Sequence, residues 1–524
     1  MHGHYGTRPL PHSGQAPPDI RKTVAIIGAG PAGLTAAHRL TAAGHPVTVI
    51  EADPHYVGGI SRTVRYKDFR FDIGGHRFFS KSAEVVDFWR QLLGPDLLTR
   101  PRASRIFYRG QFFQYPLRPA DAFSKLGPAE TFRCIASFIK ARLAPTLPAV
   151  SFQDWVTNAF GQRLFEIFFK TYTEKVWGMD CRDISADWAA QRIKGLSLAS
   201  AITDAFRPAT WQRHDAETIT TLTQQFLYPR LGPGMMWEAC ADQVTRQGGR
   251  IELGRRVVAC RLDDDNLWHI THVDEAGRAE TLHAGHVISS APLRDLVRTL
   301  DPPMPDEVRT AAADLRYRDF LIVALIARAT TSLADQWIYV HDPRVRVGRI
   351  QNFGAWSPEM VPGDAVASYG LEYFCFEHDD LWTRTDEDLI ALATDELIHV
   401  GLATREDILD GCVIRQRQAY PVYDDGYREG LARIRQALED RFPTLHLVGR
   451  NGMHRYNNQD HAMMTAMLTA QNIQARQRTF DVWRVNNDAE YIEASSADGI
   501  GEDGRLVPRR VATDRKVPAT CGKP

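Results

Sequence analysis

The stretch that most constrains the fold is TVAIIGAGPAGLTAAHRLTAAGHPVTVIEAD at residues 23–53. Its β-branched run at 24–27 predicts a buried strand, and the small residues at 31–44 predict a helix that lies close to a sheet. A second strand at 46–50 ends at the acidic Glu51. A strand, a glycine-rich turn, a helix and a strand with a terminal acid together form the unit that binds dinucleotides in Rossmann-like folds.

Each part of this unit has a mechanical role. Gly28 permits the tight turn, Gly30 lets the backbone approach a pyrophosphate, and Gly33 lets the helix pack on the strand. The helix N-terminus offers free N–H groups and a positive dipole end to phosphates. Glu51 can accept hydrogen bonds from ribose hydroxyls, and its charge disfavours the 2′-phosphate of NADP. The expected dinucleotide contacts are Gly28, Gly30, Pro31, Ala32, Gly33, Glu51 and Ala52.

The composition indicates a globular protein, because 44% of the 524 residues are hydrophobic and 24% are charged. The formal net charge of −1 argues against a broad surface for nucleic acid or anionic membranes and leaves room for a local basic pocket. No apolar run approaches the roughly 20 residues that span a bilayer. Seven cysteines without a CxxC pair predict a reduced, cytoplasmic protein with no metal site.

The region 120–215 is predicted to be mostly helical. Ser151 is a candidate N-cap, with Asp154 three residues later in a box-like position. Apolar residues then recur every three or four positions on both sides of Gly161, which predicts a pair of amphipathic helices or one kinked helix. Most of the aromatic residues there are expected to be core.

The region 315–420 is rich in predicted strands. The apolar run at 320–327 suits a buried strand, and we interpret the whole region as one antiparallel sheet. Helices are expected near 386–401 and 428–440.

A second glycine pair, Gly58–Gly59, follows the dinucleotide unit and precedes Ser61, Arg62 and the stretch FDIGGH at 71–76. This succession resembles the flavoprotein superfamily of amine oxidases, protoporphyrinogen oxidases and UDP-galactopyranose mutases. The resemblance implies FAD as the cofactor, embraced by the second glycine pair and the arginine. It also implies that a glycine-rich turn passes close to the isoalloxazine ring, through Gly74, Gly75 and His76.

The stretch at 445–473 supplies a further FAD segment, which we interpret as a strand, a glycine-rich turn and a helix that points its N-terminus at the flavin. The remaining residues expected to bind FAD are Val257, Gly449, Arg450, Tyr456 and Asn458.

An FAD-binding part made from both chain ends implies inserted domains in the middle. We therefore predict an α/β protein in which a Rossmann-like FAD-binding domain carries an inserted helical domain and an antiparallel β-sheet domain. The expected division is a tail at 1–21, FAD-binding parts at 22–118, 225–300 and 426–482, a helical substrate domain at 119–224, a sheet substrate domain at 301–425, and a polar tail at 483–524.

Within this superfamily, several short motifs are similar to UDP-galactopyranose mutases in the same order over residues 22–475. The stretch YTEKVWG matches a sugar-nucleotide-binding stretch of that family, and HRFF matches its histidine-containing turn over the flavin. The motifs GRIQNF, AYPVYD and VGRNGMHRYNNQD match its diphosphate-binding arginines and tyrosines. The residues so implied are Tyr172 and Trp177 for substrate, His76 for catalysis, and Arg349, Tyr420, Arg450 and Tyr456 for both.

The resemblance implies a mutase that interconverts the pyranose and furanose forms of a nucleotide sugar. In that family N5 of reduced FAD attacks the anomeric carbon and the nucleoside diphosphate leaves and returns. The implied partners are a nucleotide diphosphate sugar and an electron donor such as NAD(P)H or reduced flavin, with a homodimer left open. The pathway implied is the synthesis of cell-surface polysaccharide.

This chain departs from the mutase pattern at Phe79, which stands near a second histidine of the family's turn, and around 190–230, which matches poorly. Two alternatives therefore stay open. One is an FAD-dependent oxidase or desaturase of the same superfamily, which would release electrons to an acceptor. The other is a flavin-binding protein without catalytic activity.

Overall fold

The structure is a computed structural model that describes residues 19–485, except 116, 118, 187–224, 331, 332 and 425. Most of both predicted tails therefore lies outside the described residues, as does most of the region near 190–230. Within the described residues, no helix is long and apolar enough to cross a membrane.

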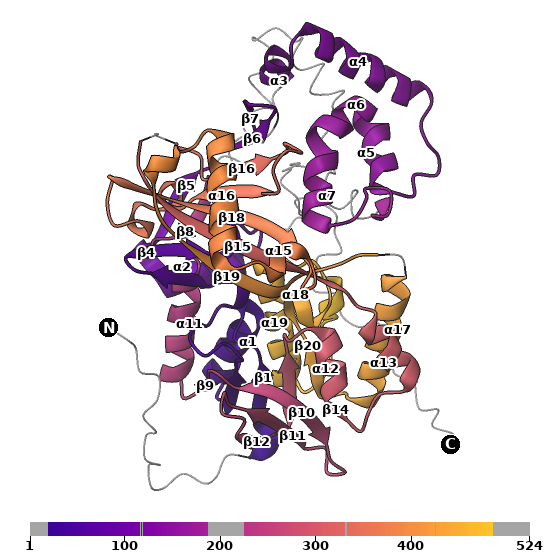
Figure 1. The fold of residues 1–524 in the computed structure, drawn as a ribbon. Coiled ribbons are helices and arrows are strands. Elements are labelled where there is room, and N and C mark those ends of the chain that lie inside the picture. Colours follow the sequence, from indigo (N-terminus) through magenta and orange to yellow (C-terminus); the bar gives the residue numbers. More distant parts are fainter. Residues whose placement is uncertain are drawn as a thin grey trace.

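The glycine-rich unit lies in a parallel sheet of five strands (Figure 1). The strand order is β20-β13-β1-β2-β9, and every neighbouring pair is parallel. The strands are β1 (Val24–Ile27), β2 (Val47–Ile50), β9 (Arg250–Glu252), β13 (His286–Ser289) and β20 (Leu445–Leu447). Three distant chain segments thus build one buried sheet, and the predicted α/β fold is confirmed.

Helices and a second sheet cover the two faces of this parallel sheet. On one face, α1 (Pro31–Ala42) packs against α11 (Gly234–Arg246) and α19 (Gln459–Gln474). The other face meets a four-stranded sheet and three helices. These elements are β10 (Arg256–Leu262), β11 (Trp268–Val273), β12 (Ala279–Ala284), β14 (Leu300–Asp301), α12 (Leu293–Thr299), α13 (Asp306–Ala313) and α17 (Tyr427–Arg441).

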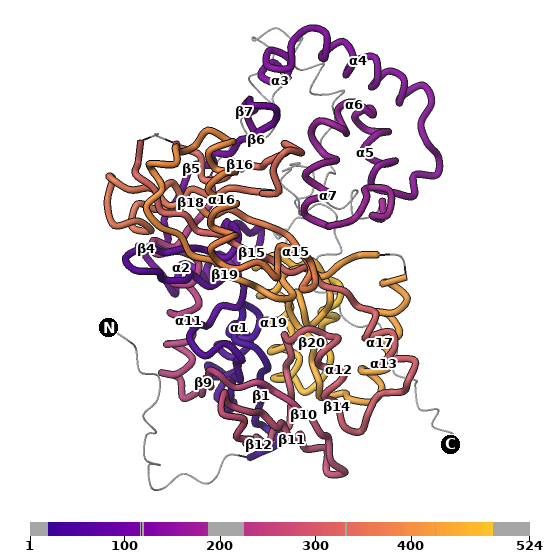
Figure 2. Tube along the Cα trace, viewed as in Figure 1, coloured from indigo at the N-terminus to yellow at the C-terminus, as the bar shows by residue number. Residues whose placement is uncertain are grey.

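A seven-stranded sheet stands above the parallel sheet, as the chain trace also shows (Figure 2). Its order is β19-β15-β18-β17-β16-β6-β7, and α16 (Asp386–Val400) packs on one face. The strands are β6 (Ser104–Tyr108), β7 (Gln111–Gln114), β15 (Tyr317–Arg328), β16 (Trp337–Val340), β17 (Arg349–Asn352), β18 (Val366–Cys375) and β19 (Ile408–Pro421). The apolar run at 320–327 is a buried strand within β15, as predicted.

The seven-stranded sheet differs in two ways from the sheet expected at 315–420. Strands β6 and β7 join its edge, although the predicted division assigned them to the first FAD-binding part. The pair β16–β6 is also parallel, whereas the other pairs are antiparallel. Buried side chains on both strands explain this pairing, because Phe107 and Ile338 join the same apolar cluster.

The helical unit forms one end of the molecule (Figure 1). It contains α3 (Pro119–Leu126), α4 (Pro128–Leu143), α5 (Phe152–Phe160), α6 (Gln162–Phe165), a π-helical turn (Glu166–Lys170) and α7 (Thr171–Trp177). Ser151 and Asp154 form the predicted capping box of α5. The helix breaks at Gly161, which has φ of 85°, so the kink falls where the sequence placed it.

Shorter elements connect these parts. They are α2 (Ala83–Leu93), the hairpin β3 (Thr63–Tyr66) and β4 (Phe69–Asp72), the pair β5 (Leu97–Pro101) and β8 (Gln225–Pro229), α14 (Phe353–Trp356), α15 (Asp380–Thr383) and α18 (Gly449–Gly452). Short 3-10 turns span Ile20–Lys22, Gly59–Ser61, Gly94–Asp96, Pro358–Met360, Arg405–Asp407 and Val482–Arg484.

We predict that Gly161→Ala destabilises the protein more than Gly127→Ala. Both glycines have similar backbone angles, with φ of 85° and 79° and ψ of 150° and 166°, so both variants bear a similar backbone strain of about 1–3 kcal/mol. A Cβ at Gly161 would lie 2.6 Å from the backbone nitrogen of Phe138, whereas one at Gly127 meets no atom within 4 Å. The clash adds about 1–3 kcal/mol. Urea unfolding measures the unfolding free energy of both variants. Equal losses of unfolding free energy would show that the α4 backbone does not restrict the space at Gly161.

Candidate active site

The first glycine loop has the geometry of a dinucleotide-binding turn. Gly28 has φ of 98°, and a Cβ at Gly33 would lie 1.9 Å from the carbonyl oxygen of Gly28. Gly30 is the N-cap of α1 and supplies no side-chain cap for the first turn. The N–H groups of that turn are therefore available to a phosphate.

The carboxylate of Glu51 lies at the end of β2, next to this loop. It accepts hydrogen bonds from the backbone nitrogen of Ala29 at 2.6 Å and of Asp53 at 2.9 Å. Burial raises the pKa of Glu51, while these backbone hydrogen bonds oppose the rise. Glu51 thus lies at the end of the strand, as predicted from the sequence. Its recognition of a ribose stays a prediction.

The second glycine pair closes over the first loop. The Gly58 nitrogen donates to the carbonyl of Ala29 at 2.8 Å, and a Cβ at Gly59 would lie 3.4 Å from the Cα of Gly30. Arg62 donates to the carbonyl of Gly59 at 2.9 Å and to Gln416 at 2.6 Å, and thereby holds the pair in place. The two glycine loops thus face each other without intervening side chains, beside the uncapped N-terminus of α1. This arrangement suits the pyrophosphate of FAD.

Four other residues predicted to bind FAD come from separate places in the chain. Gly449 meets the first loop, since its Cβ would lie 3.0 Å from that of Ala32. Val257 lies on β10 at a register shift, and Ala52 directly follows Glu51. Asn458 caps α19 in a reciprocal box with His461, so its side chain is engaged with its own helix.

His76 holds the turn that contains Gly74 and Gly75. Its Nε2 lies 2.8 Å from the carbonyl oxygen of Ile60 and 2.9 Å from that of Ile73, and its Nδ1 lies 3.5 Å from the hydroxyl of Ser61. Burial lowers the pKa of His76 to about 4, so the imidazole is neutral at pH 7. Through these contacts His76 links the turn to the backbone at Ile60 and stabilises its conformation.

Each glycine of the same turn has its own constraint. Gly74 has φ of 83°, which favours glycine. A Cβ at Gly75 would lie 2.1 Å from a ring carbon of Trp337, so packing of the indole already excludes a larger residue. The approach of Gly74 and Gly75 to the flavin ring stays a prediction, and the contact of Gly75 with Trp337 was not predicted from the sequence.

The stretch YTEKVWG forms α7, and its two aromatic residues differ. Trp177 is only 4% exposed, and its ring centroid lies 6.1 Å from that of Tyr456. Tyr172 is half-buried, stacks on His341 with centroids 5.1 Å apart, and meets Tyr339 edge-on at 5.4 Å. Trp177 is thus a core residue next to a predicted site residue, and Tyr172 belongs to an aromatic group.

Arg349 on β17 forms a buried ion pair with Glu372 on β18. The two residues are direct partners in the sheet register, and Gln351 donates to the same carboxylate at 2.6 Å. Burial disfavours the charge of Arg349, but Glu372 more than offsets this and keeps the pKa of the guanidinium above its ordinary value. Nη2 of Arg349 also donates to the hydroxyl of Tyr420 at 3.3 Å.

This pair corrects one step of the sequence argument. The resemblance implied the substrate's diphosphate as the anion that meets Arg349. The structure supplies a fully buried protein carboxylate instead. Glu372 was missed, although a lone acid inside the apolar strand VASYGLEYFCF was a signal for a buried cation nearby.

Arg450 and two tyrosines continue the cluster from Arg349. The rings of Tyr420 and Tyr456 stack with centroids 5.7 Å apart, and the guanidinium of Arg450 lies 5.2 and 4.8 Å from them. Its nitrogens donate to the carbonyls of Asn457 at 3.0 Å and Ala419 at 3.2 Å. Among the described residues, Arg450 has no carboxylate partner within ion-pair distance. Its charge is therefore available to an anion.

Three interactions fix α7 against the seven-stranded sheet. Arg318 donates to the carbonyls of Val176 and Lys175, both at 3.3 Å, and to that of Phe374 at 2.8 Å. The left-handed Gly178 ends the helix against the same guanidinium. The ammonium of Lys175 donates to three carbonyls of the 340–347 loop at 2.8–3.1 Å. The sequence reasoning did not identify Arg318 or Lys175 as positioning residues.

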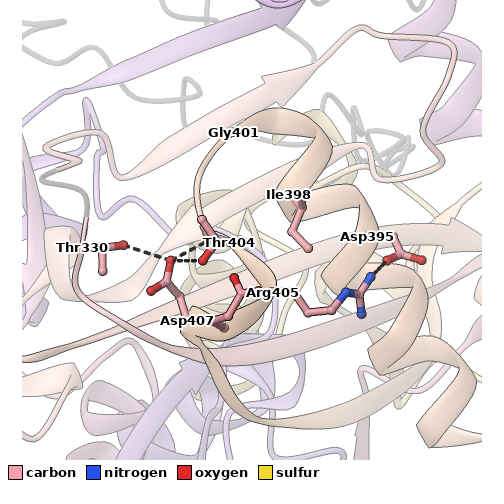
Figure 3. Close-up of a pocket in the computed structure, with 9 residues that line it drawn as sticks. Thr330, Asp395, Ile398, Gly401, Thr404, Arg405 and Asp407 are labelled. Atoms are coloured by element: carbon pink, nitrogen blue, oxygen red, sulfur yellow. Dashed lines mark hydrogen bonds and ion pairs between the residues drawn. The ribbon is translucent and has the colours of Figure 1, made fainter.

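A surface pocket of about 600 Å³ lies elsewhere, where α16 ends (Figure 3). The hydroxyls of Thr404 and Thr330 donate to the carboxylate of Asp407, at 2.8 Å and 3.2 Å. Arg405 forms an ion pair with Asp395. None of its lining residues belongs to the cluster of Arg349, Tyr420, Arg450 and Tyr456. Because Asp407, Arg405 and Asp395 are already partnered within the protein, we do not place the active site there.

Together, the glycine loops, the half-buried acid and the parallel sheet define a flavoprotein that binds FAD. The chain belongs to the family described as flavin-containing amine oxidoreductase, whose profile matches residues 31–473. This match supports an enzyme of the flavin oxidoreductase superfamily.

Two solved structures share the fold. A crystal structure of reduced UDP-galactopyranose mutase has a TM-score of 0.75 and 21% identity, over 89% of this chain and 96% of that chain. A putative protoporphyrinogen oxidase from Exiguobacterium sp. 255-15 has a TM-score of 0.66 and 18% identity, over 87% and 99%. At such identities the likeness concerns the fold alone.

Curated relatives match over shorter stretches. An L-amino acid oxidase from Crotalus durissus cumanensis is 47% identical over 70 residues, which are 13% of this chain and 14% of that oxidase. A probable UDP-galactopyranose mutase from Klebsiella pneumoniae is 26% identical over 173 residues, or 32% of this chain and 43% of that protein. The chain thus matches less than half the length of either relative.

Asp72, four residues before His76, generates a prediction about pH. It is fully buried, accepts a hydrogen bond from Thr63 at 3.0 Å and another from Tyr228, and burial raises its pKa to about 7. The folded chain therefore keeps this proton after the unfolded chain, with a pKa of 3.8, has lost it. The contribution of Asp72 to the free energy of unfolding is therefore fully present below about pH 4, and it is lost as pH rises through about 7.

We predict that Asp72→Asn removes this pH dependence. The unfolding free energy of the parent protein should fall relative to that of the variant between about pH 4 and 7, by at most about 1.4 kcal/mol per pH unit. Urea unfolding at several pH values measures the difference. Parallel stability profiles of the two proteins would contradict the assignment.

Proposed function

We propose that the protein is an FAD-dependent mutase that interconverts pyranose and furanose forms of a nucleotide sugar. The observation that carries the proposal is the cluster of Arg349, Tyr420, Arg450 and Tyr456, which three chain segments bring together. The diphosphate of a nucleotide sugar is the anion that this cluster suits. The physiological electron donor belongs to the proposal as NAD(P)H or a reduced flavin.

Charge in the cluster favours a diphosphate. Glu372 neutralises Arg349, whereas Arg450 is held by carbonyl oxygens and retains its charge for a ligand. Guanidinium groups bind phosphate oxygens bidentately, and the hydroxyls of Tyr420 and Tyr456 add donors without adding charge. The rings stacked beside Arg450 exclude water and thereby strengthen its attraction for an anion.

The chain has two tasks in such a reaction, which are to place the sugar and to stabilise the departing diphosphate. Reduced FAD supplies the nucleophile, at N5, when it is bound. Arg450 and the two tyrosines hold the diphosphate, so that it stays near the sugar and can return. Tyr172, fixed by α7, offers an aromatic face for the substrate beside Tyr339. Trp177 supports Tyr456 from behind.

An oxidase is the second candidate, because the chain shares its fold with a putative protoporphyrinogen oxidase and a short stretch with an L-amino acid oxidase. The aromatic group of Tyr172, Trp337 and Tyr339 would also suit an apolar substrate. An oxidase needs an electron acceptor at every turnover, whereas a mutase leaves the flavin reduced. This difference separates the two candidates.

We predict that the dithionite-reduced holoenzyme converts UDP-galactopyranose to its furanose form, and that the oxidised holoenzyme does not. Product is measured by chromatography, and peroxide and residual reductant are measured in parallel. Many turnovers per electron pair are expected, since the reaction has no net oxidation. Equal turnover by oxidised enzyme, or one peroxide per turnover, would exclude the mutase and favour an oxidase.

We predict that Arg349→Ala lowers kcat/KM by roughly 30- to 1,000-fold, because the variant loses the donor that positions the Tyr420 hydroxyl for the departing diphosphate. Arg349→Lys should recover only part of the rate, because lysine keeps the charge without the planar fork. Arg349→Ala also leaves Glu372 buried without its partner, so the double variant Arg349→Ala/Glu372→Gln serves as the folding control. Flavin content is measured in each variant. Normal turnover by the flavin-loaded double variant would refute the placement of the diphosphate.

A further inference from the structure

Helix α4 has one face in the core of the helical unit and an apolar face in solvent. Cys134 and Ala141 are buried where α4 packs on α5 and α6. On the opposite side, the exposed fractions are 73% for Phe132, 40% for Ile135, 51% for Ile139 and 82% for Leu143. These four residues recur every three or four positions and form one line along the helix, which we call the α4 stripe.

The chain after α4 extends this surface. Leu147 and Val150 are 77% and 71% exposed. Six of the nine large hydrophobic residues that are exposed in the described part of the chain lie between 132 and 150. Such a concentration is unusual for a monomer surface and indicates a partner. Helix α4 lies on the outer edge of the helical unit, away from the parallel sheet (Figure 1).

Cations border the stripe on both sides. At about 100° per residue, Arg133 and Lys140 lie along one edge of the stripe and Arg142 lies along the other. All three are exposed. The sole acid of α4 is Glu130, which is turned away and forms an ion pair with Arg163 at 2.5 Å and a longer one with Arg133 at 3.7 Å.

We propose that the α4 stripe, with Leu147 and Val150, lies in the interface of an anionic lipid bilayer. An apolar line bordered by lysine and arginine is the pattern of a helix that lies in the membrane plane, with side chains in the acyl region and cations at phosphates. The helix does not span the bilayer, since it has 16 residues and carries three cations near its middle and end.

Charge favours lipid over a second copy of the chain. In a two-fold dimer through this face, Arg133, Lys140 and Arg142 would meet the same cations of the other copy. The one acid of α4, Glu130, already pairs with Arg163 and Arg133 of its own copy. Anionic headgroups complement them instead. The near-neutral total charge is consistent with this surface, because only one helix is involved. The proposal depends on this face alone and does not depend on the reaction.

Flotation of the full-length, flavin-loaded protein with vesicles tests the proposal. The vesicles contain either phosphatidylcholine alone or equal parts of phosphatidylcholine and phosphatidylglycerol. We expect binding to the anionic vesicles, weakened by salt. Ile139→Ser/Leu143→Ser should reduce that binding by roughly tenfold or more. Replacing Arg133, Lys140 and Arg142 by glutamine should reduce it by about fivefold for each cation.

Leu409→Ser is the matched control, because Leu409 is 47% exposed but lies on β19 in the other part of the molecule. It should float like the parent protein. Flavin absorbance and circular dichroism confirm that every variant is folded. No flotation with anionic vesicles, or unchanged flotation of Ile139→Ser/Leu143→Ser, would overturn the proposal. A dimer that forms without lipid and is lost in that variant would also overturn it and assign the face to a second copy.

Discussion

The buried ion pair between Arg349 and Glu372 is the interaction on which the candidate active site depends. The two residues face each other across neighbouring strands, and Glu372 is completely buried. Removing either partner would leave an uncompensated charge, at a cost of about 3–5 kcal/mol. The pair therefore fixes the guanidinium between the rings of Trp337 and Phe374, from where it donates to Tyr420. Tyr420 in turn stacks on Tyr456 and positions it beside Arg450.

This arrangement links parts of the chain that fold as different layers. The arginines and tyrosines come from the seven-stranded sheet and from the segment that leads into α19 of the FAD-binding layer. Arg318 and Lys175 attach α7 of the helical unit to the same sheet. A substrate held by Arg450 thus lies where all three parts meet. Helix α4, which carries the proposed membrane surface, lies at the far side of the helical unit (Figure 1), so membrane contact there would leave this meeting point uncovered.

The sequence predicted local features well. The glycine loop, the acid at the end of β2, the cap at Ser151 and the break at Gly161 each follow from a few adjacent residues. Features that need partners far along the chain were missed. Glu372 could not be paired with Arg349 without the register of β17 and β18. Gly75 is required by Trp337, and β6 joins a sheet strand more than 200 residues away. The proposed roles of Arg349, Tyr420, Arg450 and Tyr456 came from resemblance, and they remain predictions.

The central claim is that this cluster binds a diphosphate, and a comparison of UDP with uridine tests it most directly. Calorimetric titration of the reduced holoenzyme measures both affinities, and uridine lacks only the diphosphate. The account predicts that UDP binds much more tightly than uridine. It also predicts that Arg450→Gln, which removes a charge that has no carboxylate partner among the residues the structure describes, reduces the difference by roughly tenfold or more. Equal affinities for UDP and uridine, or an unchanged difference in a folded, flavin-loaded Arg450→Gln variant, would contradict the account.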